Sequence, residues 1–209
     1  GSGLGITEAG IALMEVAASG ACFNGASSIH LSIFGINPVV KHGSEEMRRK
    51  YLPRVVSGDL HICFGVTEPD AGTDTTRIST RAVRDGDRYI INGKKVWLTK
   101  AGDSQKVLLL TRTTPLEECK KRTDGMTLFF ADLDPSAVTI RPISKMGRNA
   151  VASNEVFFDN LSVPAADLVG QEGRGFHHLL DGLNPERILG SYEGIGVGRA
   201  ALNRAAQYA

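Results

Sequence analysis

The sequence has few cysteines, almost no net charge and no long apolar run. Its 209 residues include 3 cysteines that form no CxxC pair, so neither a disulfide scaffold nor a structural zinc site is expected. The 24 basic and 23 acidic side chains nearly balance, which excludes the one-signed charge field of a nucleic-acid-binding or membrane-surface protein. No apolar run approaches the roughly 18 residues of a membrane span. The sequence therefore predicts a globular protein without a membrane span, in a reducing compartment.

Neither end of the sequence resembles a natural terminus. The chain starts at Gly1 without a methionine and stops at Ala209 inside a helical pattern. We therefore expect a piece of a longer polypeptide, and any targeting segment would lie outside this sequence.

The hydrophobic period divides the chain into three zones. The first, 1–60, is helical, and its last helix is predicted to begin after Ser44 and to end at Gly58. The second, 61–168, has the two-residue period of strands, and the third, 169–209, is helical again. Because the strands are contiguous and do not alternate with helices, we expect an α+β fold with an antiparallel β region between helices.

Two glycine-containing dipeptides predict tight turns within the β region. Asp85-Gly86 and Asn92-Gly93 are typical of type I′ hairpin turns. They would join the segments Thr80–Arg84, Tyr89–Ile91 and Val96–Thr99 into a β-meander.

The last helical segment carries a glycine at every fourth position. Gly190, Gly194 and Gly198 share one helix face, and each costs about 1 kcal/mol relative to alanine in a helix interior. A second helix packed closely on this face would offset that cost. No other segment of the sequence is an obvious mate, so we expect the mate in a missing segment or another subunit.

The residues that most suggest chemistry lie in the segment 64–74. Its sequence, FGVTEPDAGTD, begins as a strand and ends in a loop of hydroxyls, acids and a glycine. Gly72 lets main-chain N–H groups approach a ligand, and the hydroxyls of Thr67 and Thr73 can donate or accept hydrogen bonds. The same composition also fits a strand that ends in an ordinary polar turn.

The only tryptophan of the chain, Trp97, lies in a later strand segment. Its indole offers a large flat apolar face and one hydrogen-bond donor, which suits an aromatic cofactor. A lone tryptophan is, however, more often part of a protein core.

Together these segments resemble the acyl-CoA dehydrogenases. The motif VTEPDAGTD at 66–74 is followed by YIINGKKVWLT at 89–99, and so many matching positions in a fixed order are specific. The resemblance continues through KMG at 145–147, EVFFDNLSVP at 155–164 and EGRGF at 172–176, and so covers essentially the whole chain. It implies the end of an N-terminal helical domain, a barrel-like antiparallel middle β-domain and the first helix of a C-terminal bundle.

The resemblance implies an FAD-dependent enzyme that oxidises a fatty-acyl-CoA thioester to the trans-2-enoyl-CoA. In such enzymes a glutamate removes the α-proton, the β-hydride passes to flavin N5, and an electron-transfer flavoprotein accepts the electrons. Hydrogen bonds must stabilise the developing enolate, and the carboxylate base needs a site that raises its pKa. The resemblance also implies a homotetramer in the bacterial cytoplasm or the mitochondrial matrix.

The positions that would bind the flavin fall in two segments: Phe64, Val66, Thr67, Gly72 and Thr73, then Trp97, Leu98 and Thr99. In the family pattern Thr67 bonds the pyrimidine edge of the flavin, Trp97 packs on its ring and Thr99 lies near N5. Thr73 would also meet the thioester arm of the substrate. Phe64, Asp70 and Thr73 stand where tyrosine, glycine and serine are frequent in the family, and we expect cofactor binding to survive these three departures.

The position of the catalytic base is left open between two parts of the protein. Most family members carry it in a late helix outside this sequence, whereas isovaleryl- and long-chain-type enzymes carry it on the first C-terminal helix, before an arginine. Glu186 stands at that position, and Asn184 and Arg187 would contact the substrate. Alternatively, Asn184 caps a helix, Pro185 is its first residue, and Glu186 favours the N-terminal dipole.

Two other classes of function stay open besides the dehydrogenase. One is an acyl-CoA oxidase, or a flavin monooxygenase or nitroalkane-oxidase relative, on the same scaffold, and electron acceptor tests would separate it. The other is a non-catalytic relative kept for binding or assembly, which a colourless protein without FAD would support. No metal site is expected, because the adjacent His177 and His178 would point about 100° apart on a helix.

Overall fold

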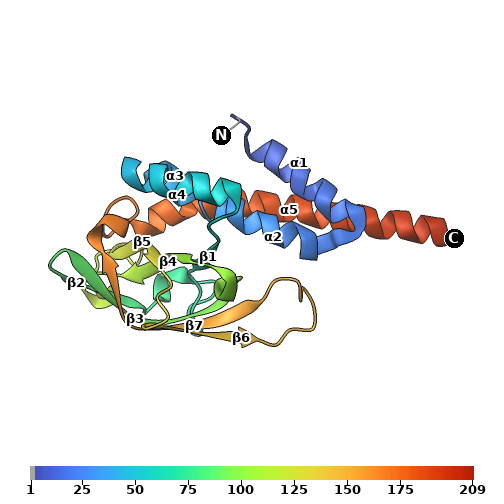
Figure 1. Cartoon of the computed structure of the whole chain (residues 1–209). Coiled ribbons are helices and arrows are strands. Elements are labelled where there is room, and N and C mark those ends of the chain that lie inside the picture. The colour runs from blue at the N-terminus through green and yellow to red at the C-terminus, as the bar shows by residue number, and fades with distance from the viewer. Residues whose placement is uncertain (1–2) are drawn as a thin grey trace.

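The computed structural model describes residues 3–209, and residues 1 and 2, which begin the expected N-terminal segment, lie outside the described residues. Helices come first, a curled sheet follows and one long helix ends the chain (Figure 1), which confirms the α+β organisation. The helices are α1 (Ile6–Val16), α2 (Cys22–Phe34), α3 (Asn37–His42), α4 (Glu45–Ser57) and α5 (Gly175–Tyr208).

Within residues 3–209, seven strands form one sheet in the order β1-β4-β2-β3-β7-β6, with β5 paired to β4. They are β1 (Ile62–Gly65), β2 (Arg81–Asp85), β3 (Arg88–Thr99), β4 (Lys106–Arg112), β5 (Met126–Asp132), β6 (Val138–Ile143) and β7 (Ser153–Pro164). The sheet is mixed and not wholly antiparallel as expected, because β1 and β2 both run parallel to β4. The long loop after β1 separates this strand from β2, so the two do not form a hairpin. Strand β1 pairs instead with β4, which runs in the same direction.

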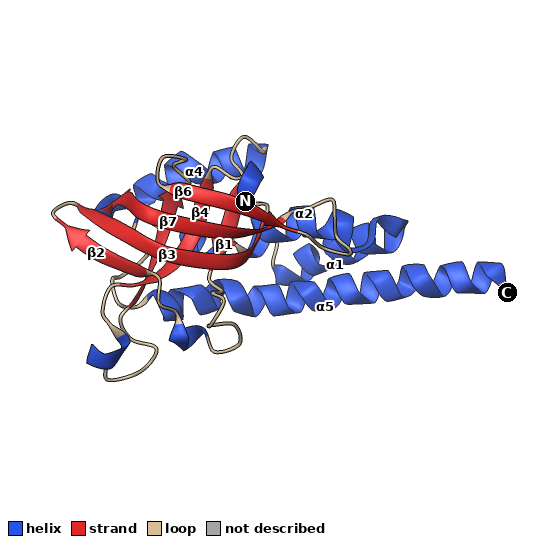
Figure 2. Cartoon of the chain, turned by 90° about the horizontal axis from the view of Figure 1, so that it is seen from below, coloured by secondary structure: helices blue, strands red, loops and turns tan. Residues whose placement is uncertain are grey.

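The sheet curls around an apolar core, with helices across its other face (Figure 2). Inside the curl, Tyr89 and Phe129 are buried together with their ring centroids 4.8 Å apart. On the other face, Tyr51 of α4 packs on Phe130 at 5.3 Å, in a cluster that also includes Leu179 of α5. Burial on both faces makes the sheet a rigid support for the loops at its edges.

The helix predicted after Ser44 is confirmed as α4. The Ser44 hydroxyl accepts a hydrogen bond from the Met47 N–H at 3.0 Å, and Gly58 ends the helix in the left-handed conformation with φ 84°. Met47 and Tyr51 are buried, as the helical period predicts.

Only the first of the two predicted hairpin turns exists. A turn at Gly86 (φ 61°) joins β2 to β3, but β3 continues unbroken through Asn92 and Gly93. Gly93 has φ 149°, lies at an irregularity in the pairing of β3 with β7, and faces Thr80 so closely that a Cβ would come within 2.8 Å of its side chain. The glycine therefore marks a bulge and a close backbone approach, not a turn.

Helix α5 runs through Pro185 without ending. Proline has no N–H, so the carbonyl of Asp181, four residues earlier, lacks its helical donor. The Asn37 side-chain amide of α3 donates to that carbonyl at 2.6 Å and replaces the missing bond. The alternative in which Asn184 caps a helix is therefore wrong.

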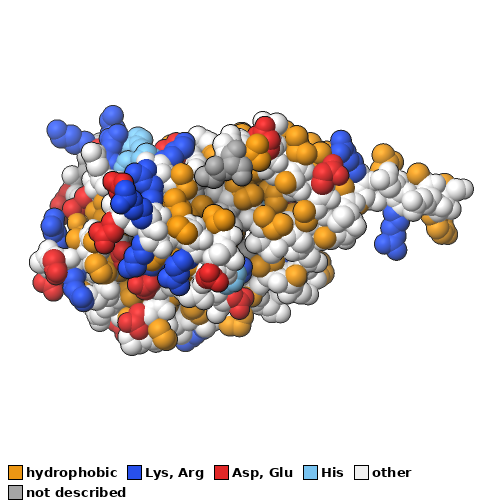
Figure 3. Space-filling model, turned by 45° about the horizontal axis from the view of Figure 1, so that its top comes forward, with side chains coloured by type: hydrophobic (Ala, Val, Ile, Leu, Met, Phe, Trp, Pro, Cys, Tyr) orange, Lys and Arg blue, Asp and Glu red, His pale blue; other side chains and the backbone are white. Residues whose placement is uncertain are grey.

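By length and composition, the helical stretch Ile6–His42 is apolar enough to cross a membrane. This differs from the expectation that no segment approaches a membrane span. The stretch is not one rod, because the backbone leaves the helical conformation at Gly20 (φ 99°) and Cys22 (φ 49°), and α1 and α2 lie side by side next to α5 (Figure 1). Apolar side chains gather on the surface of this helical half, whereas charges gather over the sheet end (Figure 3). The described elements leave much of the apolar helical surface uncovered.

The glycines that bring α5 close to its neighbours are not those of the predicted stripe. A Cβ on Gly196 would clash with the Met14 backbone of α1. By contrast, Gly190, Gly194 and Gly198 have no atom within 4 Å of an added Cβ in the described chain. That their mate lies outside these residues stays a prediction.

We expect Gly196→Ala to destabilise the chain by about 1–3 kcal/mol, because its methyl group would force α1 away from α5. Gly194→Ala is the matched control and should stabilise the chain by up to about 1 kcal/mol, since alanine is the better helix former and meets no atom. Urea unfolding of both variants measures the difference. Equal effects of the two substitutions would contradict the packing of α1 on Gly196.

Candidate functional site

The loop after β1 lies directly against the C-terminal half of β3. The Val96 N–H donates to the Thr67 carbonyl at 2.9 Å, and the Lys95 ammonium donates to the Val66 carbonyl at 3.0 Å. Gly65, at the end of β1, packs against Leu98 of β3. The structure thus brings the two predicted flavin-binding segments together at one place on the sheet.

Trp97 points out of the sheet between two buried neighbours. Val96 and Leu98 are 8% and 0% exposed, whereas Trp97 is 59% exposed. Its φ of 65° lies in the left-handed region, at the second irregularity in the pairing of β3 with β7. Such a conformation is unfavourable for a bulky residue and is typical of functional sites. The bulge turns the indole outward as an apolar surface next to the loop after β1.

The threonines of the two segments have unused hydrogen-bonding groups. Thr67 and Thr99 are half-buried, and among residues 3–209 no hydrogen bond involves either hydroxyl or the Thr67 N–H. Half-buried donors without partners cost free energy unless water or a ligand binds them. They fit the polar edge of a flat aromatic cofactor whose face rests on Trp97.

Phe64, Val66 and Leu98 have side chains that pack mainly within the protein. The Phe64 ring meets Phe34 of α2 edge-on at 5.3 Å, and the side chains of Val66 and Leu98 are buried. The Leu98 carbonyl accepts a hydrogen bond from the Asn154 amide at 2.9 Å. Val66 and Leu98 can therefore meet a ligand only through their main chains.

Gly72 and Thr73 are exposed just beyond a tight turn. Glu68 and Ala71 exchange two backbone hydrogen bonds of 3.1 Å, which close that turn. No atom lies within 4 Å of a Cβ placed on Gly72, so its backbone is open to a ligand. The turn presents both residues on the same loop as Thr67.

A buried ion pair beneath this loop escaped the sequence analysis. The Glu68 carboxylate accepts hydrogen bonds from the Ser79 N–H at 2.7 Å, the Ser79 hydroxyl at 2.8 Å, the Thr80 N–H at 2.9 Å and the Lys95 ammonium at 2.8 Å. The side chains of Lys95 and Glu68 are only 0% and 4% exposed. A signal was available, since the two-residue period of β3 places Lys95 on the same inward face as the buried Tyr89 and Ile91.

The two partners of this pair have strongly shifted pKa values. Burial would raise the pKa of Glu68, but the charge and hydrogen bond of Lys95 and the donors of the 79–80 segment lower it to about 2. Burial lowers the pKa of Lys95 to about 8, against the opposing influence of Glu68. Both side chains are ionised at neutral pH.

Glu186 lies on the inward face of α5. It stands one heptad after Leu179 and one before Glu193, which are both buried, and it is half-buried itself. Four residues earlier, Gly182 lies against the backbone of Phe34, the residue that touches Phe64. Within residues 3–209 the Glu186 carboxylate has no hydrogen bond or ion pair.

Asn184 and Arg187 are not brought to the same face as Glu186. Both are exposed, and the Arg187 guanidinium donates to the Asn184 side-chain oxygen at 2.9 Å. At 100° per residue, Asn184 points about 160° away from Glu186 around the helix. The structure therefore separates these two predicted substrate contacts from the candidate base.

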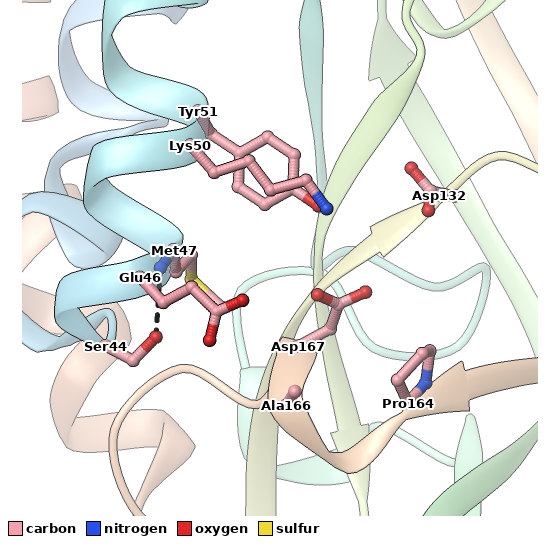
Figure 4. Close-up of a pocket in the computed structure, with 9 residues that line it drawn as sticks. All are labelled: Ser44, Glu46, Met47, Lys50, Tyr51, Asp132, Pro164, Ala166 and Asp167. Carbon is pink, nitrogen blue, oxygen red and sulfur yellow. Dashed lines mark hydrogen bonds between the residues drawn. The ribbon is translucent and has the colours of Figure 1, made fainter.

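A cavity of about 250 Å³ lies apart from these residues, between α4 and the segment after β7 (Figure 4). Its wall includes Lys50, Tyr51 and Asp167, and none of the predicted site residues. Beside it, the buried Lys106 pairs with Asp132 at 3.0 Å and with Asp167 at 3.5 Å. Among residues 3–209, no group of three or more His, Cys, Asp or Glu side chains could hold a metal ion.

Two family models match the chain. The model of the acyl-CoA dehydrogenase N-terminal domain matches residues 1–59, and that of the acyl-CoA dehydrogenase middle domain matches residues 63–161. The chain belongs to the acyl-CoA dehydrogenase family. It is 34% identical to an acyl-CoA dehydrogenase of Mycobacterium bovis, over all of this chain and 52% of that protein.

Solved acyl-CoA dehydrogenases share the fold. Butyryl-CoA dehydrogenase from Megasphaera elsdenii has a TM-score of 0.91 and 28% identity, over 99% of this chain and 53% of that one. A glutaryl-CoA dehydrogenase from Mycobacterium smegmatis, solved in complex with FADH2, has a TM-score of 0.88 and 28% identity, over 99% of this chain and 51% of that one. The chain thus spans about half the length of the relatives it matches.

We expect acid to weaken this acyl-CoA dehydrogenase fold through Glu68. A carboxyl whose pKa is lower in the folded state stabilises the fold above its ordinary pKa, and that stabilisation is lost as the pH falls through the folded value. The free energy of unfolding should therefore fall between about pH 4.5 and about pH 2. Glu68→Gln should cost about 3 kcal/mol at pH 7 and should flatten this acid dependence.

The matched control is Glu45→Gln, which removes an acid that is 70% exposed and pairs only with Arg49 on the helix surface. It should leave both the stability at pH 7 and its acid dependence nearly unchanged. Denaturant unfolding across the pH range measures both variants. If the stability of Glu68→Gln depended on acid as strongly as that of the unchanged protein, Glu68 would not be the group responsible.

Proposed function

We propose that the protein containing this chain is an FAD-dependent acyl-CoA dehydrogenase that converts an acyl-CoA thioester to the trans-2-enoyl-CoA. The observation that supports this most is the meeting of two segments: the unpartnered Thr67 donors lie next to the outward, strained Trp97. Family membership and the FADH2 complex of a similar enzyme support the cofactor. When bound, FAD would accept the β-hydride of the substrate and pass the electrons to an electron-transfer flavoprotein.

In this proposal each residue of the site binds or orients. Thr67 donates from its N–H and hydroxyl to the polar edge of the flavin, and Trp97 covers the ring and excludes water from it. Thr99 would offer its free hydroxyl to the same ring. Phe64, through its contact with Phe34, supports the ring from the helical side. Gly72 and Thr73 leave their backbone and hydroxyl free for the pyrophosphate and for the thioester arm.

We further propose Glu186 as the base that takes the α-proton. Its carboxylate has no partner among residues 3–209 and stands on the apolar inward face of α5, near Leu183 and Leu189. A carboxylate without a partner in the described chain is free to accept a proton from a substrate bound beside it. Asn184 and Arg187, on the outer side of α5, could contact only those parts of the substrate that lie outside the acyl pocket.

The protein is also proposed to be a homotetramer. The helical half exposes apolar side chains on α1, α2 and α5, among them Ile11, Phe23, Ile29, Ile195 and Leu202, and Figure 3 shows the apolar character of this half. Surfaces of this kind are typically covered in an assembly.

We expect Glu186→Gln to lower kcat by at least about a thousandfold, because an amide cannot accept the α-proton. Flavin absorbance should be retained. The assay uses a panel of acyl-CoA thioesters and a dye as electron acceptor, with oxygen consumption measured in parallel. Rapid reduction of oxygen would favour the oxidase alternative over the dehydrogenase.

The control for this variant is Glu193→Gln, which changes an acid on the same face of α5 that is paired with His30 at 3.0 Å. It should lower stability and spare most of the turnover. Full activity of Glu186→Gln would place the base outside this chain.

We expect Trp97→Ala to weaken FAD binding by at least about tenfold, since it removes the apolar surface on which the ring rests. Trp97→Phe should retain most of the affinity. Flavin fluorescence titration of the deflavinated protein measures both constants. If the unchanged protein bound no FAD at all, the non-catalytic binding or assembly alternative would gain support.

A further inference from the structure

The buried pair of Lys95 and Glu68 acts on the candidate flavin site through one peptide group. Lys95 donates to the Val66 carbonyl at 3.0 Å and to Glu68 at 2.8 Å, so its ammonium is held between the loop and its own counter-ion. Glu68 is held in turn by the 79–80 segment before β2. The two side chains therefore connect the loop after β1 to both β2 and β3.

The carbonyl that Lys95 binds belongs to the same peptide group as the Thr67 N–H. That N–H has no acceptor among residues 3–209, whereas the Thr67 carbonyl is occupied by the Val96 N–H. A cation on the oxygen of a peptide group draws electron density from its nitrogen, which makes the N–H a stronger donor. The pair thus strengthens and orients a donor that nothing in the described chain uses.

We propose that Lys95, held by Glu68, is a positioning residue that fixes and polarises the Val66–Thr67 peptide toward the pyrimidine edge of the flavin. This inference rests on the proposed function and adds to it a residue that controls the reduction potential of the flavin. A stronger donor and a nearby cation stabilise the reduced flavin, which is richer in electrons, more than the oxidised form. Lys95 therefore raises both the affinity for the flavin and its reduction potential.

The chain contains a closely matched lysine that lacks this connection. Lys106 is also buried, with 2% of its side chain exposed, pairs with Asp132 and Asp167, and donates to a backbone carbonyl, that of Phe130, at 3.1 Å. That carbonyl lies within the paired strand β5, and the ammonium rests over the Tyr51 ring at 4.6 Å. Lys106 shares the burial and pairing of Lys95 but does not touch the loop after β1.

The test compares Lys95→Met with Lys106→Met in the flavin-loaded protein. Lys95→Met should raise the FAD dissociation constant about tenfold and shift the equilibrium with a redox dye about tenfold toward oxidised flavin. Lys106→Met should lower the melting temperature and leave both flavin measurements unchanged. Lys95→Arg should restore most of the dye equilibrium, because a guanidinium can still donate to the Val66 carbonyl and to Glu68.

Equal changes in the two Met variants, or a Lys95→Met protein that loses only thermal stability, would overturn the proposal. If Lys95→Met does not fold, Lys95→Gln carries the same expectation, since its amide is uncharged. FAD binding by the unchanged protein distinguishes a failure of the proposed function from a failure of the role of Lys95. Absence of FAD binding there refutes the proposed function, whereas normal FAD binding with an unaltered Lys95→Met potential refutes only the role of Lys95.

Discussion

The candidate site depends on one buried ion pair. Two charged side chains that are almost fully removed from water are costly unless each is fully hydrogen-bonded, and Glu68 meets this requirement with four donors from Lys95 and the 79–80 segment. These donors and acceptors come from three separate parts of the β-domain. Because the charges are satisfied only in this arrangement, the loop after β1 has one position against the sheet.

The second constraint is the irregular pairing of β3 with β7. In a regular strand of twelve residues the side chains would alternate between the two faces of the sheet, and Trp97 would share the inward face of Ile91 and Lys95. The pairing shifts at Gly93 and again at Trp97, and only the second shift places its extra residue on β3 and breaks the alternation of this strand. The first lets β3 pass close to Thr80, and the second turns Trp97 outward beside Thr67. The strained backbone of Trp97, with φ 65°, thus lies at the candidate site.

Some features of the helices depend on contacts between near neighbours in sequence, and others depend on contacts between distant residues. The start of α4 at Ser44 could be predicted because a cap is a contact between residues three apart. The passage of α5 through Pro185 could not, since it depends on Asn37, which is remote in sequence but donates to the Asp181 carbonyl. The glycines of α5 follow the same rule. Their spacing was visible, but only the position of α1 decides that Gly196 is closely packed whereas Gly194 is not.

The sequence by itself determined the order of helices and strands, the α4 cap and the turn at Gly86, because these depend on hydrophobic period and on contacts between near neighbours. Its motifs also identified the loop and the tryptophan strand as one family signature. The tertiary structure decided the rest: that β1 pairs in parallel with β4, that β3 continues through Gly93 instead of turning, and that Glu68 and Lys95 are partners. Each of these features is stabilised by contacts between residues that are distant in sequence and meet only after the chain folds. A local sequence pattern therefore cannot predict them.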